Sequence, residues 1–261
     1  MIHSILSDKA TRLYLILGGF FVVNAIMAEM IGVKLFQLET VFGLSKADFT
    51  LLGQPHLSFA LSVGVLPWPI VFIMTDVIND YYGVRGVRFL TLLTTALIAF
   101  AFLVLYFAIH IAPADFWIGT SVEQGVPDMQ AAFTAIFGQG MNIIVGSLTA
   151  FVVGQLLDAW VFRSIKRVTG DKRIWLRATG STIISQLIDS VVVTYVAFFA
   201  FKGWSFQLCT ALVLTAYCYK LVIAVLATPL IYLAHSGVER YLGRPKAEAM
   251  RAAALRRSDE Q

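Results

Sequence analysis

Charge is scarce in this chain, since only 14% of its 261 residues are charged, against about 25% in an ordinary soluble domain. This shortage excludes a conventional water-facing surface over most of the length. Cysteine is also rare. The two present, Cys209 and Cys218, lie nine positions apart in one apolar stretch, which is typical of neither a disulfide framework nor a zinc site. We expect both to be small buried hydrophobic residues.

Several catalytic motifs are missing from the sequence. It has no Gly-x-x-x-x-Gly-Lys-Ser/Thr phosphate loop, no His-Glu-x-x-His zinc motif and no Gly-x-Ser-x-Gly nucleophile turn. The Gly-x-Gly-Asp pattern of an intramembrane aspartic protease is absent as well. We therefore expect a protein that is not an enzyme and that binds no cofactor and no metal ion.

Apolar residues, in contrast, make up 58% of the chain, against about 45–50% in globular proteins. A hydrocarbon core about 30 Å thick needs about 20 mainly apolar residues per helix, and such stretches recur along the sequence. They predict an all-α integral membrane protein, with six transmembrane helices in residues 1–236 and a basic cytoplasmic tail in residues 237–261. The predicted spans are roughly 13–36, 57–80, 88–111, 133–162, 177–200 and 209–235.

The lysines and arginines predict the orientation of these spans, because basic residues collect on the cytoplasmic side. Sixteen fall on one side, and two, Lys46 and Lys202, fall on the other. The basic side includes Arg163 and Lys166, in the loop between the fourth and fifth spans, and Arg177, at the beginning of the fifth span. Both termini are therefore expected in the cytoplasm of a bacterial cell, with the spans in its inner membrane.

Placing an ionisable side chain inside a span costs several kcal/mol of insertion free energy. Such residues therefore usually mark a functional site. Asn24, Asp189 and Lys220 lie near the predicted midplane, whereas Asp76, Asp80 and Asp158 lie toward the cytoplasmic ends of their helices. Residues four apart share a helix face, which places Ser181, Ser185 and Asp189 on one stripe and Gly146, Ala150, Gly154 and Asp158 on another. The ionisable and polar residues of the spans that we single out are Asn24, Glu29, Lys34, Asp76, Asn79, Asp80, Gln155, Asp158, Ser181, Ser185, Gln186, Asp189 and Lys220.

These polar groups have two explanations. Several unlike groups on different helices indicate a pocket for a small polar solute. Alternatively, Asp76, Asp80 and Asp158 pair with the basic residues that follow them at the membrane surface, and Asp189 with Lys220 forms a buried structural ion pair.

The sequence resembles the queuosine precursor transporters, also called the vitamin uptake transporter family. The resemblance covers about residues 13–235 and depends on the order of several short motifs. These are TDVINDYYG at 75–83, QLLD at 155–158, RATGST at 177–182, SQLIDS at 185–190, YK at 219–220 and TPLIY at 228–232. The family usually has glutamate where Asp80 stands and serine where Gly154 stands.

The resemblance implies import of a 7-deazaguanine, such as 7-cyano-7-deazaguanine or its aminomethyl relative, for the modified tRNA base queuosine. It also implies a six-helix fold similar to the substrate-binding components of energy-coupling-factor transporters. The alternative within this class is a vitamin-binding component that needs a separate ATPase module. The expected partners are the small-molecule deazapurine and the lipid bilayer, with no nucleic acid, and a homodimer is an open alternative to a monomer.

A guanine-like edge presents a ring N–H beside an exocyclic amine, and one carboxylate accepts both through charge-assisted hydrogen bonds. Asp189 is the first candidate for this role, with Asp76 or Asp158 next. The neighbouring ring carbonyl needs a donor, and the planar ring needs apolar walls. The complete set of predicted substrate-binding residues is Asn24, Trp68, Asp76, Asn79, Asp80, Gln155, Asp158, Ser185, Gln186, Asp189, Tyr217 and Lys220.

Overall fold

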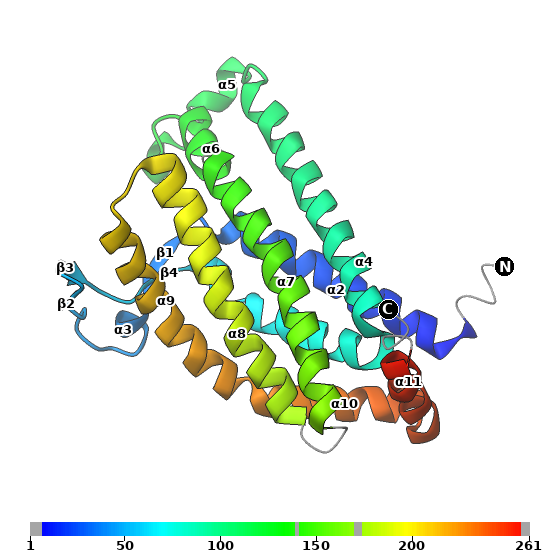
Figure 1. The fold of residues 1–261 in the computed structure, drawn as a ribbon. Helices are drawn as coiled ribbons and strands as arrows, with labels where there is room; N and C mark the ends of the chain where they lie inside the picture. The colour runs from blue at the N-terminus through cyan, green and yellow to red at the C-terminus, as the bar shows by residue number, and fades with distance from the viewer. Residues whose placement is uncertain (1–6, 139–140, 170–173, 257–261) are drawn as a thin grey trace.

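The computed structural model describes residues 7–138, 141–169 and 174–256, and most of its regular structure is helical (Figure 1). The α-helices are α2 (Lys9–Ile31), α3 (Leu38–Val41), α4 (Trp68–His110), α5 (Asp115–Ile118), α6 (Met129–Phe137), α7 (Met141–Thr169), α8 (Ile174–Thr194), α9 (Phe206–Leu226), α10 (Thr228–Leu242) and α11 (Arg244–Arg256). Two 3-10 turns, η1 (Val63–Val65) and η2 (Val122–Gln124), and a π-helical segment, η4 (Tyr195–Ala200), complete the helical elements.

Five helices in the described part of the chain are long and apolar enough to cross a membrane. They are Lys9–Ile31, Val63–His110, Ile144–Thr169, Ile174–Ala200 and Phe206–Leu226. The sequence-based count of six differs by one because the predicted spans 57–80 and 88–111 both fall largely on the second of these helices. The all-helical, membrane-spanning character is confirmed.

Helix α4 changes direction at Gly83, which has φ 76° and ψ 178° inside an otherwise helical run of 43 residues. Only glycine adopts this backbone conformation readily. Residues 68–82 and 84–110 therefore form two helical segments joined by a sharp bend. At about 1.5 Å per residue the two together would reach about 65 Å, roughly twice the thickness of a hydrocarbon core.

Two small antiparallel ladders occupy part of the segment between α2 and α4, which corrects the predicted ends of the first two spans. Strand β1 (Leu35–Gln37) pairs with β4 (Ala60–Ser62), and β2 (Phe49–Leu51) pairs with β3 (Gln54–Leu57). Helix α2 ends at Ile31, so residues 32–36 and 57–62 are not part of a spanning helix. Leu52 and Gly53 between β2 and β3 have positive φ, which a tight hairpin turn requires.

Two further predicted spans are divided in the structure. The prediction 133–162 joins the end of α6 to α7, but α6 ends at Phe137 and is followed by Gly138. The prediction 209–235 joins α9 to α10, but α9 ends at Leu226 and α10 begins at Thr228. Pro229 has no backbone N–H and cannot continue the helical hydrogen-bond ladder. Both divisions occur at the residue types that interrupt helices.

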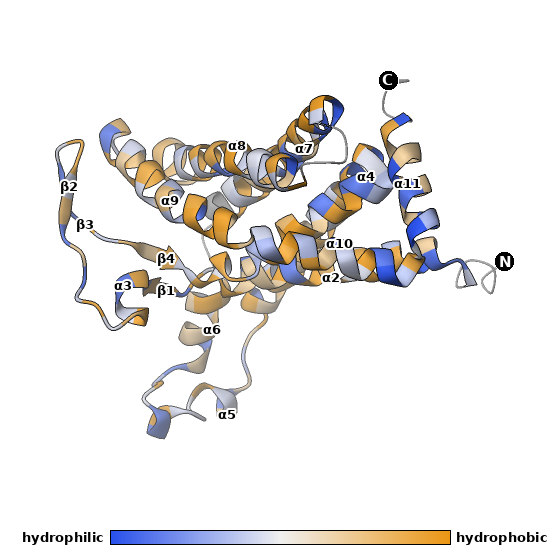
Figure 2. Ribbon diagram, turned by 90° about the horizontal axis from the view of Figure 1, so that it is seen from below, coloured by the Kyte–Doolittle hydropathy of each residue, from blue (hydrophilic) through white to orange (hydrophobic). Residues whose placement is uncertain are grey.

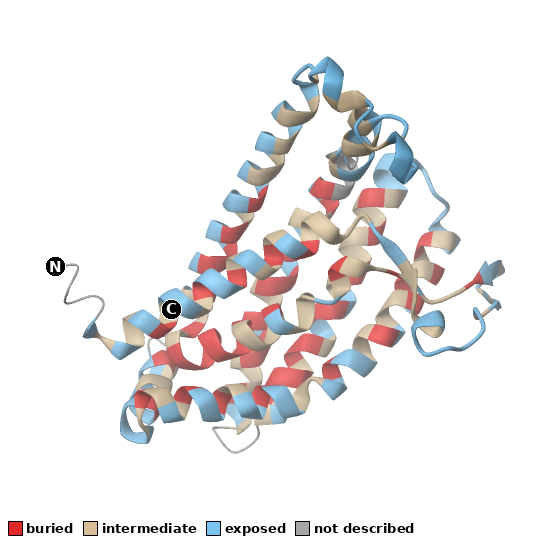
Figure 3. Cartoon of the chain, turned by 180° about the vertical axis from the view of Figure 1, so that it is seen from behind, coloured by how far each residue is buried: buried red, intermediate tan, exposed pale blue. Residues whose placement is uncertain are grey.

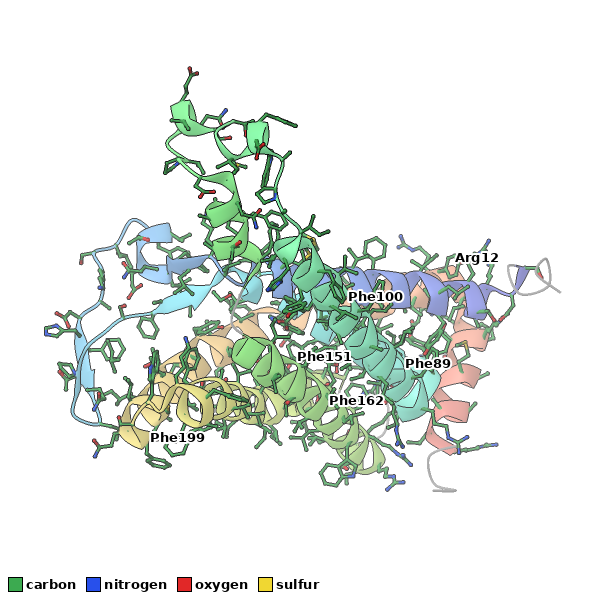
Figure 4. All side chains as sticks on the ribbon, turned by 90° about the horizontal axis from the view of Figure 1, so that it is seen from above. Arg12, Phe89, Phe100, Phe151, Phe162 and Phe199 are labelled. Carbon is green, nitrogen blue, oxygen red and sulfur yellow. The ribbon has the colours of Figure 1, made fainter. Side chains whose placement is uncertain are left out.

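The spanning helices bury small and branched residues on their inner faces and expose large apolar residues outward (Figure 3). Phe151 and Phe162 on α7 are buried and pack against residues of α4, whereas Phe89 and Phe100 on α4 are exposed (Figure 4). Apolar residues predominate along α7, α8 and α9, and α11 carries more hydrophilic ones (Figure 2). An apolar outer surface of this kind suits a lipid environment.

The small-residue stripe on α7 brings its neighbours close, as predicted. A Cβ atom at Gly146 would lie 3.1 Å from Ala197 Cβ in η4, Ala150 is fully buried, and a Cβ at Gly154 would lie 3.7 Å from Asp189 Cβ. Close approach of this kind is how small residues join membrane helices. The prediction for the cysteines is half right, because Cys209 is buried but Cys218 is exposed.

Residues of the predicted tail also pack on the bundle. Helix α11 lies beside the bend of α4, where a Cβ atom at Gly83 would lie 3.4 Å from the carbonyl oxygen of Ala254. Lys246 Nζ lies 2.6 Å from Asp8 Oδ1, immediately before α2. The beginning of α2 and helix α11 are therefore at the same end of the molecule (Figure 1).

Candidate solute-binding site

A closed ionic cluster surrounds Asp80, in the first segment of α4. Its carboxylate lies 2.5 Å from Lys166 Nζ of α7 and 3.0 Å from Arg177 Nη2 of α8. His235 of α10 places Nε2 3.2 Å from Asp80 Oδ2. All four side chains are buried, and they come from four helices. We refer to Asp80, Lys166, Arg177 and His235 as the closed cluster.

His235 completes the closed cluster through both ring nitrogens. Its Nδ1 lies 2.9 Å from the carbonyl oxygen of Ile231, and its Nε2 faces the carboxylate of Asp80. Three basic residues therefore meet the single carboxylate of Asp80.

Lys166 and Arg177, which the sequence places on the basic cytoplasmic side, are not solvated in the structure. Both are buried, at 5% and 0% exposure, because helices α7 and α8 continue beyond the predicted span ends. A signal for this was present, since Arg177 lies one turn before the predicted Ser181 stripe and Lys166 lies two turns after Asp158. Long basic side chains at such positions reach back along the helix to a carboxylate.

A second pair of carboxyl groups lies between α4 and α7. Asp76 is 1% exposed and Asp158 is fully buried. Hydrogen bonds on either side align the two helices, since Thr75 Oγ1 donates to Gln155 Oε1 at 2.7 Å and Asn79 Nδ2 donates to the carbonyl of Ala159 at 2.9 Å. We call Asp76 and Asp158 the carboxyl pair.

The two members of the carboxyl pair differ in their hydrogen bonds. Ser185 Oγ donates to Asp158 Oδ1 at 3.0 Å. Neither oxygen of Asp76 has a hydrogen-bond partner among the described residues. This makes Asp76 unusual, because buried polar atoms in folded proteins are nearly always hydrogen-bonded.

A third group, at the predicted midplane, is open to its surroundings. Lys220 Nζ of α9 lies 2.6 Å from Asp189 Oδ2 of α8, and the two side chains are 19% and 25% exposed. The pairing predicted from depth is confirmed. Gly154 of α7 leaves space beside Asp189, whose Oδ1 would be 3.9 Å from a Cβ there. We call Asp189 and Lys220 the open pair.

Glu29 of α2 adds a further carboxylate near the open pair. Ser147 Oγ donates to Glu29 Oε1 at 2.5 Å. Ser147 and Gly154 are seven residues apart on α7 and therefore lie on the same face, so Glu29 and Asp189 approach α7 from the same side. Four helices, α2, α7, α8 and α9, thus contribute polar groups around the open pair.

Other predicted residues are occupied elsewhere. Asn24 Nδ2 donates to the carbonyl of Phe20 within its own helix, and Tyr217 Oη donates to the carbonyl of Ile183. Trp68 packs against Phe72 and Phe151, with ring centroids 6.2 and 5.6 Å apart. Among the described residues, no hydrogen bond joins Asn24 or Trp68 to Asp189 or Lys220. Gln186 and Ser185 are buried on α8.

The chain matches the family described as "Putative vitamin uptake transporter" over residues 62–234. It belongs to this family. Among curated proteins, it is 31% identical to the "Probable queuosine precursor transporter" of Bacillus subtilis strain 168, covering 66% of this chain and 71% of that protein. It is 24% identical to the "Queuosine precursor transporter" of Escherichia coli strain K12, covering 65% and 70% of the two chains. No solved structure matches it.

Membership in this family makes the protein a multi-pass membrane transporter and not an enzyme. The matched range contains both members of the open pair and both members of the carboxyl pair. It begins after α2 and therefore excludes Asn24 and Glu29. The predicted similarity to energy-coupling-factor components stays a prediction.

Proposed function

We propose that this transporter imports a queuosine precursor, 7-cyano-7-deazaguanine or 7-aminomethyl-7-deazaguanine, across the bacterial inner membrane for tRNA modification. The observation that carries the proposal is the open pair, a carboxylate and an ammonium exposed together between α8 and α9 at 2.6 Å. Relatives at 24–31% identity are named for queuosine precursors.

The groups of the open pair complement the edge of a 7-deazaguanine. The ring N–H and the adjacent exocyclic amine of the substrate donate to the carboxylate of Asp189. The ring carbonyl beside them accepts from the ammonium of Lys220. A site that satisfies substrate donors and acceptors in this way rejects analogues that lack them, because its own buried polar groups would be left unpaired.

Six crossings with both termini in the cytoplasm belong to the same proposal. The contact of Lys246 with Asp8, which brings α11 and the beginning of α2 together, supports termini on the same side of the membrane and hence an even number of crossings. Counting the two segments of α4 on either side of Gly83 as separate crossings gives six. A reporter fused after residue 125 should then be periplasmic, and reporters after residues 170 and 261 should be cytoplasmic.

The second candidate is the substrate-binding component of a vitamin transporter that recruits a separate ATPase module. The family description names vitamin uptake and no energy source. The two candidates differ in energy source. Co-purification with an ATPase pair, and transport that stops when ATP is removed from the side that holds the ATPases, would support the second. Transport by the purified chain alone in lipid vesicles would support the first.

The test of the substrate is uptake of labelled 7-cyano-7-deazaguanine by cells that cannot synthesise deazaguanines. Expression of the chain should restore uptake and the queuosine content of tRNA. Unlabelled 7-aminomethyl-7-deazaguanine and guanine serve as competitors, and only deazaguanines that share the transport route should reduce the signal. Uptake equal to that of cells without the chain would contradict the proposal.

A further inference from the structure

Asp76 is the one residue of the described chain with both carboxyl oxygens buried and without a hydrogen-bond partner. It lies on the first segment of α4, one turn before Asp80, and is 1% exposed. The pair Thr75–Gln155 and the pair Asn79–Ala159 fix the backbone on both sides of it. These hydrogen bonds position Asp76 without any contribution from its own carboxyl group.

The charges around Asp76 do not provide it with a partner. The charged groups that act on Asp76 are two carboxyl groups, Asp158 on α7 and Asp80 on its own helix, and one guanidinium, Arg177 on α8. The basic side chains of the region contact Asp80 instead, with Lys166, Arg177 and His235 at 2.5 to 3.2 Å from its carboxylate. Arg251 on α11 lies over the ring of Tyr81.

Burying a carboxylate without a partner is so unfavourable that the group takes up a proton instead. Two carboxyl groups in one dry site share this tendency, because the first negative charge opposes the second. Asp158 has one serine donor but also one oxygen without a partner among the described residues. The two carboxyl groups of the carboxyl pair are thus suited to hold one proton between them.

We propose that the carboxyl pair is the proton-binding site of a proton-coupled importer, with Asp76 as the residue that carries the proton. This inference rests on the proposed function, since it assigns the ion that moves together with the substrate. It does not depend on which member of the open pair contacts the deazaguanine, because the carboxyl pair lies between α4 and α7 and the open pair lies between α8 and α9.

Each step of the coupling conserves charge and protons. With the pair accessible from outside, a hydronium ion of the external solution transfers its proton to a carboxylate oxygen of Asp76: one O–H bond of the hydronium breaks, an O–H bond forms on Asp76, and water is released. The neutral pair can then be enclosed, as in the buried arrangement seen here. After reorientation, the O–H bond breaks and the proton passes to water on the cytoplasmic side, which restores the carboxylate.

The test uses the full-length purified protein in lipid vesicles with labelled 7-cyano-7-deazaguanine. A gradient of about one pH unit, acidic outside, should raise the steady-state ratio of internal to external substrate to about tenfold for one proton per molecule. A protonophore should return the ratio to one. A sodium gradient at equal pH should leave the ratio at one.

The informative variant is Asp76→Asn, which keeps the volume of the side chain and cannot bind the proton. Its steady-state ratio should stay at one in the same pH gradient, and substrate exchange at equal pH measures separately whether the variant still transports. A steady-state ratio is independent of the amount of active protein, so a merely structural role of Asp76 would slow the approach without changing the ratio. Asp115→Asn, an exposed aspartate of α5, is the matched control and should accumulate substrate as the wild type does.

Three results would overturn the inference. These are wild-type accumulation that ignores the pH gradient, accumulation driven by sodium, and tenfold accumulation by Asp76→Asn. If Asp76→Asn is inactive in exchange, the wild-type ratio and the variant Asp158→Asn decide, and the latter should also reduce the ratio to one. Wild-type protein that neither binds nor exchanges the deazaguanine would instead contradict the proposed function.

Discussion

Asp80 and Asp189 each lie within hydrogen-bonding distance of a lysine, at 2.5 Å from Lys166 and 2.6 Å from Lys220. In the closed cluster these side chains are 0% and 6% exposed, and Arg177 and His235 add further contacts. In the open pair they are 25% and 19% exposed, and Gly154 leaves space beside the carboxylate. The same two chemical groups therefore occur in two different settings within one bundle.

The comparison separates structural ion pairs from binding groups. A carboxylate surrounded by Lys166, Arg177 and His235 has no remaining capacity for a solute, and removing it would leave the lysine and the arginine buried without a counter-charge. In the open pair, each charged group has one charged partner and is partly exposed. Each can therefore replace part of that contact with a contact to a substrate. We therefore expect the closed cluster to control stability and the open pair to control affinity.

The largest expected effect is on stability at the closed cluster. Asp80→Asn leaves Lys166 and Arg177 buried beside a neutral amide, and breaking a buried pair in this way costs about 3–5 kcal/mol. Thermal unfolding of the purified variant in detergent measures the loss. Asp115→Asn, at an exposed position, should melt as the wild type does. If Asp80→Asn unfolds at the wild-type temperature, the distinction between the two regions fails.

The next effect is on substrate affinity at the open pair. Asp189→Asn keeps volume but places an amide donor against the donors of the deazaguanine. Losing a charge-assisted pair should cost about 2–4 kcal/mol, or roughly 30- to 1,000-fold in affinity. Binding of 7-cyano-7-deazaguanine to the folded, purified variant measures this change. Wild-type affinity would remove Asp189 from the substrate site.

A smaller effect is expected from the ammonium of the open pair. Lys220→Met keeps the length of the side chain but removes the donor to the substrate carbonyl, and uptake should fall at least about tenfold, or about 1.4 kcal/mol. Uptake of labelled substrate, normalised to the amount of protein in the membrane, is the measurement. Lys202→Met changes an exposed lysine and should transport normally. Normal transport by Lys220→Met would show that the lysine only neutralises Asp189.

The smallest effect belongs to an ion pair more exposed than either region. Asp8 accepts from the backbone N–H of Thr11 at 3.0 Å and pairs with Lys246 at 2.6 Å. The contact with Lys246, followed by those with Thr11, holds the pKa of Asp8 well below its usual range. Its stabilising effect is therefore present above the ordinary aspartate pKa of about 3.9 and disappears as the pH falls through the lower value of the folded protein.

Asp8→Ala should accordingly lower the unfolding temperature slightly at neutral pH, and the difference from the wild type should shrink in acid. Asp8→Ser retains a helix-capping oxygen and loses only the pair with Lys246, which separates the two contributions. A difference that grows as the pH falls would contradict the assignment.

The sequence predicted the family, the membrane class and the approximate positions of the spans, because these depend on local composition and on short motifs read in order. It also predicted that Lys220 would meet Asp189, since both lie near the midplane of adjacent helices. It did not predict the strands between α2 and α4, where the apolar pattern resembles that of a helix and the pairing of β1 with β4 joins residues 23 to 27 positions apart.

The roles of Lys166, Arg177 and His235 depended on the tertiary structure. In the sequence they read as basic or polar residues at the cytoplasmic edge, where a solvated side chain is the usual outcome. Only the packing of α7, α8 and α10 around α4 brings all three to Asp80 and removes them from water. Composition and spacing determined that this chain spans a membrane and carries charges within it. The three-dimensional arrangement decided which carboxyl groups are buried with basic partners, which are partly exposed, and which have no hydrogen-bond partner among the described residues. Burial and pairing depend on the distances between helices that are far apart in the sequence.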